Sequence, residues 1–520
     1  MPERDGGTGK HDGRDGLVRR QRWIGMPIAS VVLASLFVSA EADSAREGDA
    51  LVTVRSTPPV AAAPVTAARA AGGYNVVTIM TDDMNDVSCQ DTTKYFPRSG
   101  AQLLQGTCYE NARVASPVCC PSRAAYLTGQ LPHNNRVRTI EDGKKLTAAD
   151  TVQYRLRQAG VSTYGVGKWL NGVPMKQMAD PAYDTGFSED DFWKPRRYRD
   201  YDVIGEDGQI GPPRPMVHTT VYTGNLLNGF VEDSLERGDR FYAYGAFMAP
   251  HNQHVTHHSA AELPQATRAN RDKPVPRFDY RPEADTKDKL PVFQRSHRGR
   301  AYYARVNAAR VRAHYDVDQQ VNRLFRILRA HDALDDTVVF VTSDNGYQLG
   351  QNNWEYKGAP YAGSLDVPLL AYYPESIDSP PVVRRPVNLL DLAPTLFELF
   401  GVAPTTRLDG YSLLGGHRRT AEFYEITNLG TGDETGRGGG IPSWAEYIEG
   451  GKAFIQFYSR RGTLVREEFY ADPGYQRNLL HRAYAGQAPG KATLKRFRAL
   501  LTRARSCAGT TATGAANPCP

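Results

Sequence analysis

The stretch NVVTIMTDD, residues 75–83, determines the predicted fold, because it reads as a short buried strand that ends in two aspartates. Four more short β-rich runs follow along the chain: STYGVGK (162–168), RFYAYGAFMAPH (240–251), TVVFVTSDN (337–345) and VPLLAYYP (367–374). Segments with helical patterns lie between them, at residues 148–159 and 300–330, and after them, at residues 389–400. Short apolar strands that alternate with helices are typical of an α/β domain with a largely parallel, buried sheet.

Polar side chains stand at the carboxyl ends of most of these runs. They are Asp82, Asp83, Lys168, His251, Asp344 and Asn345. Loops at the carboxyl ends of the strands carry the site in open α/β sheets, so we expect these side chains to meet at one edge. Each residue alone also has a purely structural explanation, such as a helix N-cap or a turn.

After Gly415 the pattern changes to alternating runs with glycine turns, namely TAEFYEI, WAEYIEGGKAFIQFYS and TLVREEFYADP, and a helical segment follows at residues 491–504. This pattern predicts a small antiparallel sheet with a C-terminal helix. We therefore divide the chain into a main α/β domain at residues 74–415, a smaller subdomain at residues 416–505 and a tail at residues 506–520.

The N-terminus reads as an export signal. Arginines at positions 19, 20 and 22 precede an apolar run over residues 23–40, and small residues follow at a cleavage site. We predict a signal peptide over residues 1–42 and a disordered linker over residues 43–73. An uncleaved membrane anchor is the alternative for the apolar run. The sequence holds no Asn-x-Ser/Thr sequon, which favours bacterial export to the periplasm, cell surface or medium over a lysosomal location.

The composition fits a globular protein with a sizeable core, since 40% of the 520 residues are hydrophobic. The 63 basic and 57 acidic residues give a net charge of +6, which is too mild to argue for a nucleic-acid partner. No basic stripe with interleaved aromatic residues occurs, so we expect no nucleic-acid binding. A mildly basic protein does not repel an anionic substrate.

Six cysteines occur in the chain. In an oxidising compartment, Cys89 could pair with Cys108 and Cys507 with Cys519, although the spacing does not fix the connectivity. Cys119 and Cys120 are then left side by side. A disulfide between adjacent cysteines is strained and uncommon.

These two cysteines lie in SPVCCPSRAAYLTGQLPHN, residues 116–134, and open the pentapeptide Cys119-Cys120-Pro121-Ser122-Arg123. This Cys-x-Pro-Ser-Arg pattern resembles the signature of the sulfatase family, in which the first cysteine is oxidised to formylglycine. The resemblance implies that Cys119 is the functional cysteine and that Cys120 occupies the variable position. It also implies an alkaline-phosphatase-like sandwich, with a large mostly parallel sheet between helices and a small antiparallel C-terminal subdomain.

Other motifs stand in the order that the family has, from about residue 75 to residue 480. NVVTIMTDD resembles the first metal motif and SDNGYQLGQ the second. GVGKWLN and YKGAPYAGSLDVPLL imply Lys168 and Lys357 as sulfate-binding lysines, and APH implies His251 as the proton donor or leaving-group contact. Arg123 is expected to hold the nucleophile and the metal ligands in place. EEFYADPGYQRNLL is similar to the usual C-terminal close of sulfatases.

The resemblance also implies a chemistry. A formylglycine aldehyde hydrates to a geminal diol, so one hydroxyl attacks sulfur and the second allows the sulfate to be expelled. An enzyme that generates formylglycine is therefore an expected partner. Oxygen ligands from Asp82, Asp83, Asp344 and Asn345, together with the modified Cys119, suit a hard cation, calcium first and magnesium second. Zinc is disfavoured because His and Cys ligands are lacking.

Within the family, the double cysteine, GKWLN and YQLGQ are most similar to the branch of glucosamine-6-sulfatases and heparan 6-O-endosulfatases. Where many sulfatases have a histidine two residues after the motif lysine, this chain has Leu170, and His133 and His254 are the candidate substitutes. Gln348 replaces the branch's usual histidine. The acidic residues that commonly follow the motif tyrosine are replaced by Ala362, Gly363 and Ser364.

We therefore predict an exported sulfatase that hydrolyses a sulfate monoester, with a sulfated sugar of the N-acetylglucosamine 6-sulfate type as the preferred substrate. An arylsulfatase is the alternative within the family. A phosphonate monoester or phosphodiester hydrolase uses the same fold and nucleophile. A non-catalytic protein that binds sulfated glycans is the third hypothesis, against which the presence of the complete set of site residues argues.

Overall fold

The predicted strand at residues 75–83 forms as β1, Asn75–Thr81, inside an eight-stranded sheet with the order β13-β2-β12-β9-β1-β8-β4-β5 in the computed structural model. The other strands are β2 (Thr107–Tyr109), β4 (Ser162–Lys168), β5 (Glu189–Trp193), β8 (Phe241–Ala246), β9 (Thr337–Ser343), β12 (Leu369–Tyr372) and β13 (Val382–Val383). Strands β9, β1, β8, β4 and β5 pair in parallel, whereas β12 is antiparallel to β9 and β2. The predicted mostly parallel sheet is confirmed.

The structure describes residues 73–193, 197–205, 207–213, 217–253, 263–283, 286–294, 298–427, 440–472, 474–511 and 514–520. The predicted signal peptide and almost all of the predicted linker lie outside these residues. The domain boundaries drawn from the sequence stay predictions.

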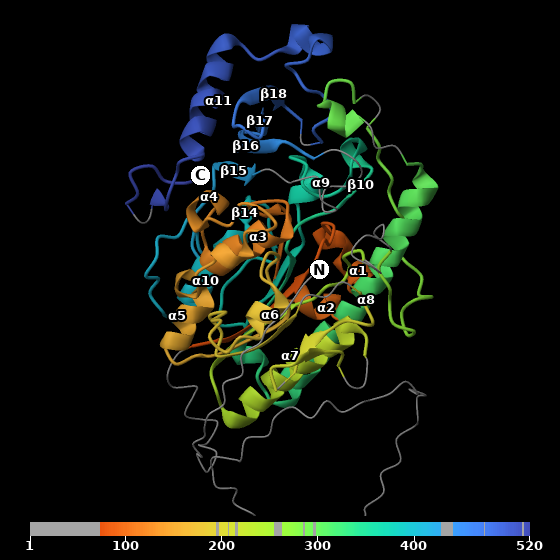
Figure 1. The fold of residues 1–520 in the computed structure, drawn as a ribbon, viewed down its shortest axis with the longest axis vertical. Helices are drawn as coiled ribbons and strands as arrows, with labels where there is room; N and C mark the ends of the chain where they lie inside the picture. The colour runs from red at the N-terminus through yellow and green to blue at the C-terminus, as the bar shows by residue number, and fades with distance from the viewer. Residues whose placement is uncertain are drawn as a thin grey trace, which may run out of the picture. The chain divides into compact units, whose positions relative to one another are not determined.

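Helices pack against both faces of the sheet, as a sandwich requires (Figure 1). Val76 and Met80 of β1 share a hydrophobic core with helices α3, α5 and α10, while Val77 and Ile79 share one with α7 and α8. Successive strand residues point to opposite faces, so β1 serves both cores. These helices are α3 (Cys119–Thr128), α5 (Val152–Gln158), α7 (Thr219–Arg237), α8 (Arg300–Ala330) and α10 (Leu392–Phe400).

The predicted helix at residues 300–330 is confirmed with the same bounds as α8. The segment predicted at 389–400 divides into a 3₁₀ turn, Leu389–Asp391, and α10. A capping box between Asn388 and Asp391 fixes the start of this segment. Shorter elements are α1 (Thr92–Tyr95), α2 (Gly100–Leu103), β3 (Ala112–Arg113), α4 (Pro132–Asn135), α6 (Met175–Met178), β6 (Val203–Ile204), β7 (Ile210–Gly211), β10 (Gln348–Leu349), β11 (Glu355–Tyr356), α9 (Ala362–Leu365) and β14 (Val387–Asn388).

The predicted antiparallel C-terminal sheet is also confirmed. It has the order β15-β16-β17-β18, with β15 (Ala421–Ile426), β16 (Ser443–Glu449), β17 (Lys452–Tyr458) and β18 (Leu464–Tyr470). Helix α11 (Lys491–Ala504) covers one face, where the ring of Phe497 packs edge-on against Phe454 and Phe469.

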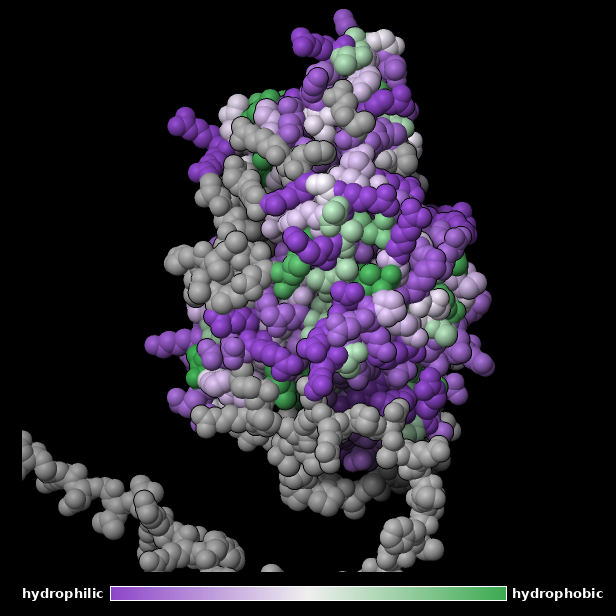
Figure 2. All heavy atoms as spheres, turned by 90° about the vertical axis from the view of Figure 1, so that its right-hand side faces the viewer, coloured by the Kyte–Doolittle hydropathy of each residue, from purple (hydrophilic) through white to green (hydrophobic). Residues whose placement is uncertain are grey.

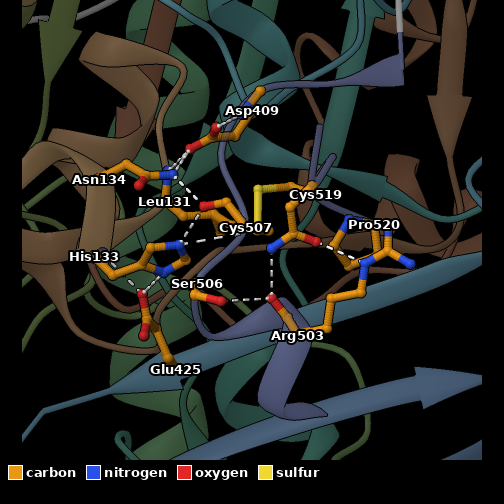
Figure 3. Close-up of a disulfide and its surroundings, with 12 residues drawn as sticks. Leu131, His133, Asn134, Asp409, Glu425, Arg503, Ser506, Cys507, Cys519 and Pro520 are labelled. Carbon is orange, nitrogen blue, oxygen red and sulfur yellow. Dashed lines mark hydrogen bonds and ion pairs between the residues drawn. A yellow bond between two sulfur atoms is a disulfide. The ribbon is translucent and has the colours of Figure 1, made fainter. Parts of the chain in front are cut away.

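Two disulfides form between the predicted partners, Cys89 with Cys108 and Cys507 with Cys519. Figure 3 shows the second one, which closes a loop within the tail, beside His133 and Asn134 of the main domain. His133 Nε2 and Asn134 Nδ2 bond the carbonyl of Cys507 at 2.9 and 3.0 Å. The main domain and the tail are therefore joined by hydrogen bonds as well as by the chain.

Hydrophilic side chains dominate the face drawn in Figure 2. Large hydrophobic side chains that are exposed in the described residues are Ile210, Leu464 and Val465. Among the helices described, none has the length and apolar character needed to cross a membrane.

The buried carboxyl of Glu446, in β16, predicts a pH dependence of the free energy of unfolding. Its side chain is 0% exposed, and burial, partly offset by Arg113, raises the pKa of its carboxyl from 4.5 to about 8. The folded protein therefore holds this proton more tightly than the unfolded chain, so the contribution to stability is complete below pH 4.5 and is lost as the pH rises to 8. Glu446→Gln should raise the free energy of unfolding at pH 9 by roughly 2–4 kcal/mol and change it little at pH 5.

Urea unfolding at the two pH values measures this difference. The exposed Glu375→Gln is the matched control and should keep the parental pH dependence. A Glu446→Gln effect of equal size at both pH values would contradict the prediction.

Candidate active site

Cys119 begins α3, directly after Val118 in an extended conformation. Its side chain is 0% exposed, and three charged groups surround the sulfur. Lys357 Nζ lies 2.8 Å and Lys168 Nζ 3.4 Å from Sγ, and the thiol donates to Asp82 Oδ1 at 3.3 Å. The N-terminal end of a helix carries partial positive charge, so this position favours an anion.

The sheet explains why the predicted residues meet. Asp82 and Asp83 follow β1, Lys168 ends β4, and Asp344 follows β9, and these parallel strands end at the same edge. Backbone hydrogen bonds continue beyond the strands, from the Asp344 amide to the Thr81 carbonyl at 3.1 Å. Adjacent parallel strands therefore bring residues together that lie more than 250 positions apart.

Three side chains contact the carboxylate of Asp83. Lys357 Nζ lies 2.7 Å from its Oδ1, Asn345 Nδ2 donates to the same oxygen at 2.6 Å, and His251 Nε2 lies 3.5 Å from Oδ2. Its backbone has a φ of +65°, in the left-handed region, and its amide donates to Asp344 Oδ1 at 3.1 Å. This conformation turns the chain so that consecutive carboxylates reach one site.

Arg123 completes the set. From one turn along α3, its Nε donates to Asp344 Oδ2 at 2.8 Å and its terminal nitrogen lies 3.4 Å from Asp82 Oδ2. The structure thus brings together all nine predicted site residues: Asp82, Asp83, Cys119, Arg123, Lys168, His251, Asp344, Asn345 and Lys357.

The buried carboxylates and the buried cations of the site are equal in number. Three carboxylates, of Asp82, Asp83 and Asp344, face the cations of Arg123, Lys168 and Lys357. Burial opposes ionisation of Asp82, but Lys168, with which it forms an ion pair, acts together with His251, Arg123 and Lys357 and holds the pKa of this carboxyl well below its usual range. Burial and the neighbouring Asp82 raise the pKa of Asp344. Burial and both carboxylates also raise the pKa of the Cys119 thiol.

The residues fit a cation with oxygen ligands. Asn345 Oδ1 is buried and accepts no hydrogen bond within the described part of the chain, so a ligand position is free. Candidate ligand atoms of Asp82, Asp83, Cys119 and His251 lie within 4.8 Å of one another. Carboxylate and amide oxygens are the donors that calcium and magnesium prefer.

The sulfatase family model matches residues 74–402, which is more than half of the chain. The chain belongs to the sulfatase family. It is 28% identical to human N-acetylglucosamine-6-sulfatase over 369 residues, which cover 65% of this chain and 63% of the human protein. It is 27% identical to the extracellular sulfatase SULF-1 homolog of Drosophila melanogaster, covering 65% of this chain and 31% of that protein. The chain therefore spans less than two thirds of these curated relatives.

Solved structures confirm the fold. One, described as BT4656 in complex with its substrate D-glucosamine-2-N,6-O-disulfate, has a TM-score of 0.60 at 20% identity and covers 83% of this chain and 97% of that chain. Another, the phosphonate monoester hydrolase of Silicibacter pomeroyi, has a TM-score of 0.57 at 19% identity and covers 83% of this chain and 95% of that chain.

Cys120 is adjacent to Cys119 in α3, but the two thiols have different partners. Its side chain lies in the core between the sheet and α3, α5 and α10, and its thiol donates to the Asn171 carbonyl at 3.3 Å. Burial raises the pKa of this thiol. Two adjacent cysteines of one sulfatase thus face different surroundings.

Several sequence departures from the sulfatase branch have a structural account. Gln348 is buried, donates to the Gln351 carbonyl at 3.0 Å and accepts from Ser364 at 2.9 Å, so it stabilises its own loop. His133, a candidate substitute for the missing histidine, instead contacts Glu425 and the tail disulfide (Figure 3). The other candidate, His254, lies outside the described residues.

Arg310 of α8 is a site neighbour that motif comparison misses. Its side chain is 2% exposed and donates to the backbone carbonyls of Asp83 and, at 3.2 Å, Pro250. The guanidinium also lies 3.8 Å from the centroid of the Tyr347 ring. The sequence signal that could have identified Arg310 is the helical periodicity, which places an arginine on the apolar face of α8 between Val306 and Val317.

We expect Arg310→Lys to lower both turnover and calcium affinity by about 10–100-fold, because an ammonium cannot bond both carbonyls in the planar geometry of a guanidinium. Isothermal titration calorimetry with calcium gives the affinity, and thermal unfolding checks the fold. Arg312→Lys, on the same helix but facing outwards, is the matched control. Unchanged calcium affinity in a folded Arg310→Lys variant would refute the positioning role.

Proposed function

We propose that this chain hydrolyses a sulfate monoester and that Cys119 is the precursor of a formylglycine nucleophile. One observation carries the proposal in a member of the sulfatase family: Cys119 Sγ lies at the start of α3 within 3.4 Å of the ammonium groups of both Lys168 and Lys357. A nucleophile placed between two cations and a helix N-terminus suits attack on an anionic ester.

Each neighbouring side chain takes a role that follows from its contacts. Lys168 and Lys357 attract the sulfate oxygens and neutralise charge during its transfer. Arg123 keeps Asp82 and Asp344 in place through its bonds to both carboxylates. His251, beside Asp83, donates the proton that the leaving oxygen needs.

A bound cation and the modified side chain of Cys119 complete the proposal. Asp82, Asp83, Asp344 and Asn345, with the modified Cys119, would hold calcium, which as a bound cation polarises a sulfate oxygen. The hydrated aldehyde of formylglycine supplies a hydroxyl nucleophile together with a second hydroxyl that restores the aldehyde. A formylglycine-generating enzyme is then a required partner, and its supply decides whether Cys119 is converted.

A sulfated glucosamine, of the N-acetylglucosamine 6-sulfate type, is the proposed substrate class. Support comes from the human N-acetylglucosamine-6-sulfatase among the relatives and from the glucosamine disulfate complex among structures of the same fold. Gln348 and the segment 362–364 depart from the branch, and an aryl sulfate is therefore the second substrate to assay. We also propose export, on the N-terminal sequence pattern and the extracellular sulfatase relative.

A phosphonate monoester or phosphodiester hydrolase is the second candidate function, because a solved enzyme of that activity shares this fold. The same cations serve either tetrahedral anion. Turnover of glucosamine 6-sulfate, an aryl sulfate, an aryl phosphonate and a phosphodiester on one enzyme preparation separates these functions. Faster turnover of both phosphorus esters would overturn the proposal.

The adjacent cysteines provide a matched pair of variants. Cys119→Ala should lower turnover by more than about 1,000-fold because the nucleophile is lost, whereas Cys120→Ala should retain most of it. Mass spectrometry of the peptide that contains both residues should show aldehyde at Cys119 and an intact thiol at Cys120. The reverse pattern in either measurement would sink the assignment of Cys119.

Removal of the cation tests the oxygen-ligand site. Extended dialysis against a chelator should lower turnover by at least about tenfold, and calcium should restore it more fully than magnesium, because calcium tolerates irregular sets of oxygen ligands whereas magnesium demands near-ideal octahedral geometry. Direct calcium titration of Asp344→Asn should show weaker binding than the parent. Full activity after verified removal of all divalent metal would contradict the site.

A further inference from the structure

A cavity of about 490 Å³ lies at the edge of the large sheet, and its walls include none of the nine site residues. Its polar lining consists mainly of Tyr109, Tyr373, Asp378, Arg384, Arg385 and Arg418. These residues come from the end of β2, the chain after β12, the residues that follow the edge strand β13 and the loop that reaches residue 418. A volume of this size matches ordinary small-ligand pockets.

Two buried tyrosine hydroxyls lie in the lining and bond each other at 3.0 Å. Tyr109 is 4% and Tyr373 5% exposed, and burial raises the pKa of both phenols, so both stay protonated. A pair of hydroxyls uses only one of its two protons for the shared bond. The second proton is available to an acceptor in the cavity.

The charges in the lining favour an anion. The lining holds three arginines and one aspartate, and Glu110 beside Arg384 brings the local net charge to +1. Arg384 forms an ion pair with Glu110 at 3.0 Å, and Arg385 donates to the Leu413 carbonyl at 3.1 Å. Within the described part of the chain, Arg418 takes part in no ion pair and is exposed. Guanidinium groups are suited to bind the paired oxygens of sulfate and carboxylate.

The backbone holds this cavity in shape before any ligand enters. The amide of Cys108 donates to the Pro381 carbonyl at 2.9 Å, and the amide of Glu110 donates to the Val383 carbonyl at 2.9 Å. Thr107 Oγ1 donates to the Pro380 carbonyl at 2.8 Å. A preformed site requires little ordering when it binds.

From the cavity volume, the guanidinium groups and the available phenol proton, we infer that this cavity is a separate binding site for one anionic sugar unit, which carries either a sulfate ester or a carboxylate. Val382, Val383 and Leu413 add apolar wall for the face of a sugar ring. The preference for an oxyanion follows from the lining, whereas the sugar that carries it rests on the proposed function.

The test uses the full chain with Cys119→Ala, so that no ligand is consumed. Glucosamine 6-sulfate, glucuronate and uncharged N-acetylglucosamine are titrated by calorimetry. We expect glucuronate to bind one site and glucosamine 6-sulfate two, while the uncharged sugar leaves the cavity empty. If only one of the two anions binds in the cavity, the result shows whether the cavity takes a sulfate ester or a carboxylate.

Arg418→Glu should weaken binding in the cavity by at least about tenfold, because it reverses a charge in the lining. Arg461→Glu, on the exposed turn between β17 and β18, is the matched control and should bind as the parent does. Tyr373→Phe should weaken binding less, because it removes only a hydroxyl.

Arg418 is exposed, so its variant is expected to fold, and thermal unfolding confirms this. Equal binding by Arg418→Glu and Arg461→Glu would overturn the inference. So would equal binding of the uncharged sugar, or no binding of either anion at millimolar concentration. A sulfatase turnover measured separately on the Cys119 protein tells whether the proposed reaction itself stands.

Discussion

Three carboxylates buried at one edge of a sheet cannot all stay ionised unless cations accompany them. Asp82, Asp83 and Asp344 meet this constraint with Arg123, Lys168 and Lys357, which arrive from α3, β4 and the loop after β11. Three separate parts of the chain must therefore be in place before the charges balance. In the proposed reaction, a divalent cation added to this balanced set would leave a net charge of +2, which would attract an anionic ester.

The C-terminal sheet contributes to this arrangement from outside the site. Trp444 of β16 donates to the Gly358 carbonyl at 2.9 Å, and the Gly358 amide donates to Pro117 at 3.1 Å. These bonds fix the residue after Lys357 and the loop before Cys119 at the same time. A second link is Tyr361, whose hydroxyl donates to the buried Glu468 of β18 at 3.3 Å. The smaller sheet thus supports the lysine beside Cys119.

Much of the fold follows from local patterns. β4 and α8 have the bounds that the sequence indicates, because a buried strand and an amphipathic helix each have a clear period. The antiparallel direction of β12 was not predicted, since strand direction depends on partners far along the chain. The run predicted as strand to residue 251 ends at Ala246, where the chain turns and the His251 amide bonds the Met248 carbonyl.

The site could be predicted where a residue belongs to an ordered motif at a strand end, as Asp82 and Lys168 do. Arg310 could not, because its role arises only when α8 packs behind the loops of Asp83 and Pro250. Within the described residues it forms no ion pair with a carboxylate, and burial lowers its pKa despite the nearby Tyr347 and Asp83. Such a buried cation is costly, and its partners among the described residues are backbone carbonyls, the Asn85 side-chain oxygen at 3.4 Å and a tyrosine ring. A residue that stabilises the fold alone would be replaced at less cost by an apolar side chain, so its position behind Asp83 and His251 argues for a role in holding the site.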